Sequence, residues 1–182
     1  IQKLPPETRR CLEQHLEVLD EVQEQIDQLE ARMKERIQVT EKMKLLKTLP
    51  GVGDILAIVI EREVGCIDRF PDNGRLASYC GTTPKVRASG GKVRHGRTRP
   101  DVNRYLKWAF IEAANVVVRH QNRRGWQQRH VTRLYKRIRS RRGPAIAVGA
   151  VARHLSEAAY WVLKKREPYR EPKANTVLPK PR

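Results

Sequence analysis

Apolar residues near the start of the chain recur with the spacing of a long helix that has one apolar edge. Residues 12–47 contain no glycine or proline. Within this segment apolar residues fall seven positions apart, with others three positions after them: Leu12, Leu19, Ile26 and Met33, followed by Val22 and Leu29. This a/d pattern is typical of a coiled coil or a long helical hairpin, so residues 1–46 are predicted to form a helical arm. The pattern fits a helix that packs on its own body as well as one that dimerises.

The next segment, residues 46–60, predicts two helices joined by a tight glycine turn. One helix should end before Pro50, and an apolar helix should begin near Asp54. Between them, Gly51 and Gly53 permit a turn that exposes backbone amides. This arrangement is typical of a helix-hairpin-helix module, in which such amides at the start of the second helix bind a DNA phosphate without reading a base. An ordinary turn between two helices is the alternative.

A strongly basic segment follows at residues 85–99. Two copies of Lys-Val-Arg flank a Ser-Gly-Gly turn, and the residues alternate with a period of two on both sides. This pattern predicts a β-hairpin with Ser89 at its tip. Six basic residues and no acidic one occupy the segment: Lys85, Arg87, Lys92, Arg94, Arg97 and Arg99. We expect these six side chains to bind phosphate groups.

Helices are expected in most of the remaining chain. Their predicted ranges are 101–119 with Asp101 as the cap, much of 119–142, and 145–165. The second range has ten Lys or Arg and no acidic residue, which makes its polar face a candidate phosphate track. Arg133 and Arg137 are the residues of that face that we select as phosphate ligands.

These elements predict a mainly α fold. A coiled-coil or long helical arm, residues 1–46, should precede a basic helical body, residues 47–166, which contains the helix-hairpin-helix and the small β-hairpin. The tail, residues 167–182, has four prolines and is expected to be extended or disordered.

The charge of the chain indicates a polyanionic partner. There are 38 Lys and Arg against 20 Asp and Glu, a formal charge of +18. Residues 1–44 hold ten acidic and eight basic residues, so the arm is close to neutral and the body carries the excess. DNA is therefore the first partner to consider. No apolar run is long enough to span a membrane, and three cysteines at irregular spacing predict a reducing cytoplasm without zinc or disulfides.

Ser89 is the candidate nucleophile. A serine in a Ser-Gly-Gly turn is usually only a turn residue. Here the surrounding cations could neutralise a phosphodiester and stabilise the transition state of an attack on phosphorus. The carboxylates are not spaced like a two-metal nuclease cluster, and the histidines show no metal-binding spacing, so no metal ligand is predicted in this chain.

Four motifs together resemble a known family. They are LPGVG at 49–53, RLASYCGTTPKVRASGGKVRHGRTR at 75–99, NRYLKWAFIEAA at 103–114 and RGPAIAVGAVARHL at 142–155. Residues 45–170 resemble the C-terminal transposase domain of the insertion-sequence 110 family, whose members are relatives of the pilin-gene invertases. The heptad arm resembles the coiled coil that precedes this domain.

The resemblance implies a prokaryotic DNA transposase or site-specific recombinase acting in the cytoplasm at the nucleoid. In that family an N-terminal ribonuclease-H-like domain binds Mg²⁺ through an Asp/Glu/Asp/Asp set, and the serine at the position of Ser89 attacks DNA. A structured guide RNA directs these enzymes, so RNA is expected as a partner beside DNA. The coiled-coil arm predicts a homo-oligomer, with a second copy of the chain as a further partner. The acidic domain is absent from this sequence, so the chain is expected to be inactive alone. A non-catalytic helix-hairpin-helix module of a repair or RNA-processing complex is the alternative.

Overall fold

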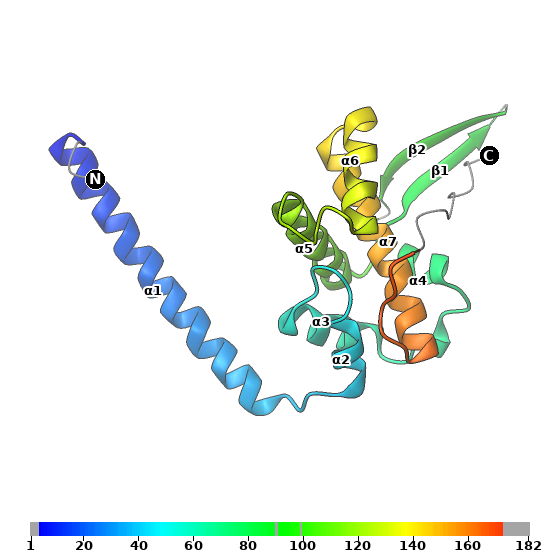
Figure 1. The fold of residues 1–182 in the computed structure, drawn as a ribbon, viewed down its shortest axis with the longest axis horizontal. Helices are drawn as coiled ribbons and strands as arrows, with labels where there is room; N and C mark the ends of the chain where they lie inside the picture. Colours follow the sequence, from blue (N-terminus) through cyan, green and yellow to red (C-terminus); the bar gives the residue numbers. More distant parts are fainter. Residues whose placement is uncertain (1–3, 90, 99, 173–182) are drawn as a thin grey trace. The chain divides into compact units, whose positions relative to one another are not determined.

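The chain folds mainly into helices, as predicted. The computed structural model describes residues 4–89, 91–98 and 100–172. The chain separates into two units, Ile1–Val39 and Thr40–Arg182, and Figure 1 follows their elements along the chain. Among the described residues, no helix combines the length and the hydropathy needed to cross a membrane.

The first unit is a single long helix, α1 (Pro6–Arg36). Pro6 occupies the first helical position, where its missing N–H costs no hydrogen bond. The apolar residues of the predicted seam lie on the surface of this unit: Leu19, Val22, Ile26 and Leu29 are between 42% and 62% exposed. The helix therefore carries an apolar stripe of the kind that the heptad pattern predicts.

The break between the two units comes before the predicted boundary at residue 46. Ile37 has an extended backbone, and α2 (Glu41–Leu46) begins a new helix. Thr40 causes this restart, because its side chain oxygen accepts a hydrogen bond from the Met43 amide at 3.1 Å. Met43 and Leu46 are buried, so α2 belongs to the core of the second unit and not to the arm.

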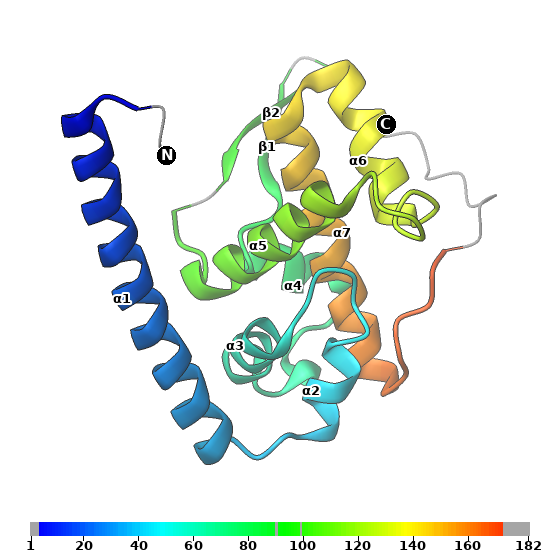
Figure 2. The same ribbon diagram turned by 60° about the vertical axis from the view of Figure 1, so that its left-hand side comes forward.

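Helix α7 (Pro144–Lys165) lies at the centre of the second unit. Its fully buried residues recur about four positions apart: Ala147, Val151, Leu155 and Ala159. That spacing puts them on one face. The helices α4 (Asn73–Tyr79), α5 (Arg104–His120) and α6 (His130–Arg142) pack against α7. Figures 1 and 2 show α5 and α6 beside it.

The glycine turn joins α2 to α3 (Asp54–Val64), and a short helix, η1 (Ile67–Arg69), leads on to α4. Leu49 and Val52 of the turn are buried, while Gly53 is exposed. Helix α3 packs on both α2 and α5. The predicted pair of helices around residues 47–53 is therefore present.

Helix α5 begins at a different cap from the one predicted. Asn103, not Asp101, is the N-cap, and its side chain oxygen accepts from the Leu106 amide at 2.9 Å. The nitrogen of the same side chain, Asn103 Nδ2, donates a hydrogen bond to Glu63 Oε2 at 2.6 Å. A carboxylate could accept from the helix but could not donate to Glu63, which explains why an asparagine suits this position.

The predicted β-hairpin is confirmed. Strands β1 (Pro84–Ser89) and β2 (Lys92–Thr98) pair antiparallel, with a bulge between Pro84 and Val86. Ser89 pairs with Lys92, so the connection has two residues. Gly91 of this connection has φ of +72°, as tight hairpin turns require.

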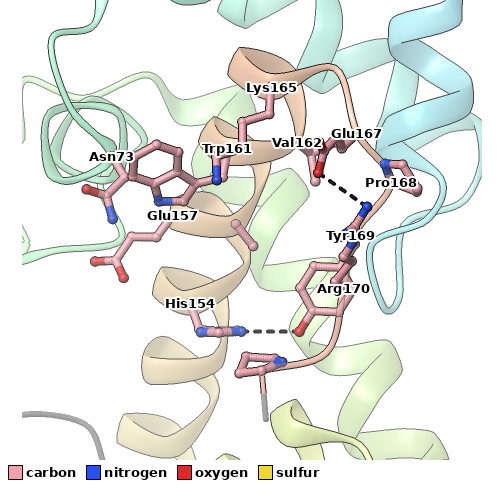
Figure 3. A pocket seen from close by; sticks show the side chains of 12 residues that line it. Asn73, His154, Glu157, Trp161, Val162, Lys165, Glu167, Pro168, Tyr169 and Arg170 are labelled. Atoms are coloured by element: carbon pink, nitrogen blue, oxygen red, sulfur yellow. Dashed lines mark hydrogen bonds and ion pairs between the residues drawn. The ribbon is translucent and has the colours of Figure 1, made fainter. Parts of the chain in front are cut away.

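The first part of the predicted tail is extended and fastened to the second unit. The Tyr169 amide donates to Thr48 Oγ1 at 2.7 Å, and the His130 amide donates to Glu171 Oε2 at 2.8 Å. The tail and α7 enclose a pocket of about 340 Å³, and Figure 3 shows the Tyr169 hydroxyl directed toward His154 within it. Residues 173–182 of the predicted tail lie outside the described residues.

The histidine beneath the tail predicts a loss of stability in acid. Burial, together with the positive charge of the nearby His130, lowers the pKa of His154 from 6.5 to about 4. The folded state therefore favours the neutral imidazole. Its contribution should be complete above pH 6.5, and up to about 3 kcal/mol should be lost as the pH falls from 6.5 to 4.

Denaturant unfolding at several pH values tests this expectation. His154→Phe keeps an aromatic ring but removes the titration, so the variant should lose less stability between pH 7 and 4 than the unsubstituted chain. Because the remaining carboxylates and His130 titrate in both proteins, the difference between the two curves isolates His154. Parallel curves would contradict the argument.

Candidate nucleic-acid interface

The candidate nucleophile Ser89 lies at the end of β1, exposed to solvent. The strand register places Ser89 opposite Lys92, and Arg87 opposite Arg94. In the backbone register of the hairpin, Ser89 therefore lies among basic residues. A polyanion is the partner that such a concentration of positive charge favours.

The other basic residues of the predicted clamp extend from the same hairpin. Lys85 is exposed on β1, and Arg97 belongs to β2, within the bulge opposite Lys85. Arg99 lies outside the described residues. Five of the six predicted cations therefore belong to one pair of strands, together with the serine.

The two glycines of the turn, Gly51 and Gly53, have different surroundings. Gly51 has φ of +84°, and a Cβ at this position would overlap the carbonyl oxygen of Ala113 in α5. Gly51 is therefore required for the close packing of the turn on α5. Gly53 has open space around it and is the N-cap of α3, where the first amides of the helix have no partner within the helix.

The first residue of α3 is acidic, next to the predicted phosphate site at Gly53. Asp54 is its first residue and pairs with Lys47 at 2.5 Å, which places an acidic group in the first turn. Any phosphate near Gly53 would have Asp54 as a neighbour. Phosphate binding at Gly51 and Gly53 stays a prediction, and Gly51 also has a packing role that the residue pattern alone did not reveal.

Arg133 and Arg137 are exposed and lie one turn apart on α6. Both are close to His130: burial lowers the pKa of this histidine, the Glu171 carboxylate opposes the change, and the two guanidinium groups lower the pKa further. Val131, Leu134 and Tyr135 are buried on the other side of the helix. Helix α6 therefore has one buried face and one exposed basic face, and phosphate binding by Arg133 and Arg137 stays a prediction.

The described residues include no grouped set of metal ligands, and the buried cysteine, Cys80, is not a reactive thiol. Within residues 4–89, 91–98 and 100–172, no three His, Cys, Asp or Glu side chains are grouped to hold a metal ion. Burial raises the pKa of the Cys80 thiol to about 12, so this cysteine is an inert core residue. Ser89 is an exposed hydroxyl within a segment of the sequence that is rich in basic residues.

Four residues that line a hollow between α5 and α6 were not predicted from the sequence. Two of them are basic and two have side chain amides. Gln121 and Asn122, at the end of α5, lie beside Lys136 and Arg139 of α6 and line a common hollow. Lys136 and Arg139 belong to residues 119–142, which contain no acidic residue, and this pattern could have indicated them. From that segment we selected only Arg133 and Arg137. The two amides have no comparable signal in the sequence.

Comparison with known proteins points to mobile DNA elements. The family model described as transposase IS116/IS110/IS902 family matches residues 43–130. The insertion element IS110 43.6 kDa protein of Streptomyces coelicolor is 36% identical over 97 residues, which cover 53% of this chain and 24% of that protein. The transposase for insertion sequence element IS1111A of Coxiella burnetii is 26% identical over 168 residues, 92% of this chain and 45% of that protein.

A third relative, the insertion element IS116 44.8 kDa protein of Streptomyces clavuligerus, is 27% identical over 95 residues, 52% of this chain and 24% of that protein. The chain thus spans from a quarter to less than half of the length of these curated relatives. The matched residues 43–130 include the glycine turn, the serine hairpin and α5. The resemblance predicted from the sequence is therefore confirmed, and this part of the chain is similar to the IS116/IS110/IS902 transposase family.

Proposed function

We propose that this chain is part of a transposase in which Ser89 attacks a DNA phosphodiester. The observation that carries the proposal is the position of Ser89, exposed at the tip of a basic two-stranded hairpin. The match of residues 43–130 to a transposase family supports the transposase part of the proposal. The non-catalytic alternative explains the basic surface but gives the exposed serine no role.

The reaction that we propose is a transesterification. Ser89 Oγ forms a bond to phosphorus while one phosphorus–oxygen ester bond of the DNA strand breaks. The hydroxyl proton passes to solvent, and the departing DNA oxygen takes a proton in return, so the ester energy is kept in the phosphoserine link. Lys85, Arg87, Lys92 and Arg94 would offset the charge that builds up on the phosphate oxygens. The glycine connection next to Ser89 leaves room for the DNA backbone.

The Mg²⁺ that the family resemblance implies does not fit the described residues, which offer no grouped set of metal ligands. We therefore derive no step through a metal ion. Our proposal is that the implied Asp/Glu/Asp/Asp domain supplies the metal in the complete transposase. Residues 1–182 alone should then bind DNA without forming a covalent link.

The proposal extends to the partners. DNA and a structured guide RNA would both present phosphates to the second unit. The further residues that we propose as their ligands are Gly51, Gly53, Arg97, Arg99, Arg133 and Arg137. A helix-hairpin-helix contact at Gly53 would position the DNA backbone without reading its sequence.

The covalent link itself provides the test. A transposase that carries this chain together with the carboxylate domain would be incubated with labelled substrate DNA and then denatured. We expect a labelled protein band that survives denaturant, and peptide mass spectrometry should place the nucleotide on the peptide that contains Ser89. A link on another residue, or cleavage without any link, would refute the assignment.

We also propose that the first unit mediates self-association. Leu19 and Ile26 occupy corresponding positions of the heptad pattern and are 62% and 42% exposed in α1. The double variant Leu19→Asp/Ile26→Asp would bury charges in the seam of a coiled coil and should dissociate it. Sedimentation equilibrium should then report the mass of one chain.

The matched control adds the same two charges outside the seam. Gln14→Asp/Gln28→Asp places them at c positions of the heptad, and this variant should keep the mass of the unsubstituted chain. An unchanged mass for the seam variant would show that α1 does not assemble through these residues.

A further inference from the structure

The hollow between α5 and α6 has the composition of an anion site. It has a volume of about 390 Å³ and is lined by Gln121, Asn122, Lys136, Arg139 and Ser140. We propose that it is a phosphate site for the backbone of a nucleic acid, in addition to the serine hairpin. The choice of nucleic acid as the source of the phosphate rests on the proposed function, whereas the preference for an anion rests on the residues of the hollow.

The lining supplies donors and positive charge without a carboxylate. Lys136 and Arg139 carry full charges, and the side chain amides of Gln121 and Asn122 can each donate two hydrogen bonds. The Ser140 hydroxyl donates to the Arg137 carbonyl at 3.0 Å, so it contributes no donor. Residues 119–142 contain no Asp or Glu, so no acid of this stretch competes for the cations. A cation or an acidic group would therefore be disfavoured here.

The loop that holds one side of the hollow is fixed in advance. The Trp126 ring stacks on His120 with 5.2 Å between centroids, and the Arg129 guanidinium carbon lies 4.5 Å from the centroid of the same indole. The Gln127 side chain donates to the Asn122 carbonyl at 2.9 Å, which ties the loop back to its beginning. A loop already held in place loses little conformational entropy when a ligand binds, which favours tighter binding.

The neighbouring surface favours a polyanion over a small anion. Arg133 and Arg137 form an exposed row on α6 next to Lys136, and Arg123 and Arg124 are exposed on the loop. A free phosphate would occupy the hollow alone, but a nucleic-acid strand can place successive phosphates in the hollow and along this row. The site therefore fits a backbone phosphate within a chain.

The dependence of binding on salt tests this proposal with residues 1–182. The probes are a 20-base-pair DNA duplex and an RNA duplex of the same sequence. Lys136→Gln/Arg139→Gln should reduce the slope of log affinity against log salt by about one for each side chain. Between 50 and 200 mM salt, the loss of two contacts should lessen the salt-induced weakening about tenfold. Arg62→Gln/Arg75→Gln removes the same charge from exposed positions of α3 and α4 and should keep the slope.

Two further measurements guard against misfolding and non-specific effects. Lys136→Arg/Arg139→Lys should restore the slope, because it keeps both charges. In the unsubstituted chain, the side chain amide resonances of Gln121 and Asn122 should shift during titration with the duplex. A lower slope for Lys136→Gln/Arg139→Gln than for the unsubstituted chain would support the site. Whether the slope falls with DNA, with RNA or with both would identify the nucleic acid whose phosphate binds there.

Equal slopes for the hollow variant and its control, or unshifted amide resonances at saturation, would overturn the proposal. The measurement requires no strand cleavage. If no serine adduct formed, the proposed function would be refuted but the phosphate site in the hollow would not. If the slopes were equal, the phosphate site would be refuted but the role of Ser89 would not.

Discussion

Replacing Ser89 by alanine should abolish the denaturant-resistant protein–DNA adduct of the complete transposase. The adduct requires an oxygen at this position, so the expected loss is complete and not partial. Strand exchange should disappear with it, because every later step starts from the phosphoserine link. Gel electrophoresis under denaturing conditions, with labelled DNA, measures the adduct, and a recombination assay measures its consequence.

The variant should remain folded, which makes its inactivity informative. Ser89 is exposed at the end of β1, so the loss of one hydroxyl group should change the free energy of unfolding by less than about 0.5 kcal/mol. Ser78→Ala removes a hydroxyl from α4, away from the hairpin, and should retain the adduct. If Ser89→Ala recombined DNA at the normal rate, Ser89 would be a turn residue and the nucleophile would have to be sought elsewhere.

Replacing Gly51 by alanine should destabilise the second unit far more than the same change at Gly53. An alanine at φ of +84° is strained, and its Cβ would overlap the Ala113 carbonyl of α5. Together these effects should cost about 2–5 kcal/mol, since the turn must move away from the helix on which it packs. Denaturant unfolding should report a lower midpoint for Gly51→Ala with an unchanged slope.

Gly53→Ala is the matched control, because it adds the same methyl group two residues away. Nothing lies near the position of its Cβ, and its backbone is already in a region that alanine adopts, so it should cost less than about 1 kcal/mol. Similar losses for both variants would contradict the packing role of Gly51.

Local patterns were sufficient for the elements whose partners are close in sequence. The β-hairpin was predicted because its two strands and its turn lie within fifteen residues, so alternation and turn chemistry define the pairing. The helices around residues 47–53 followed from Pro50 and the glycines for the same reason. The mainly α fold required only helical periodicity and the absence of other long strand patterns.

Contacts between distant residues could not be predicted in this way. Asp101 and Asn103 are both ordinary caps, and the choice between them depends on Glu63, which lies forty residues earlier. The hollow is a similar case, since Gln121 and Asn122 meet Lys136 and Arg139 only when α6 packs beside the end of α5. The packing role of Gly51 likewise depends on Ala113 of another helix. Each of these features is set by tertiary structure, which a local pattern does not contain.

The hydrogen bond between Thr48 and Tyr169 has a consequence for the order in which the body can form. Its two residues are 121 positions apart, so almost the whole second unit must be closed into a loop before they meet. During synthesis the chain emerges from its N-terminal side, and the turn at Thr48 is made long before its partner. Helix α7, which packs on α2, α4, α5 and α6, also follows all four of them in the chain. The contact between Thr48 and the tail is therefore made only after residue 169 has been added.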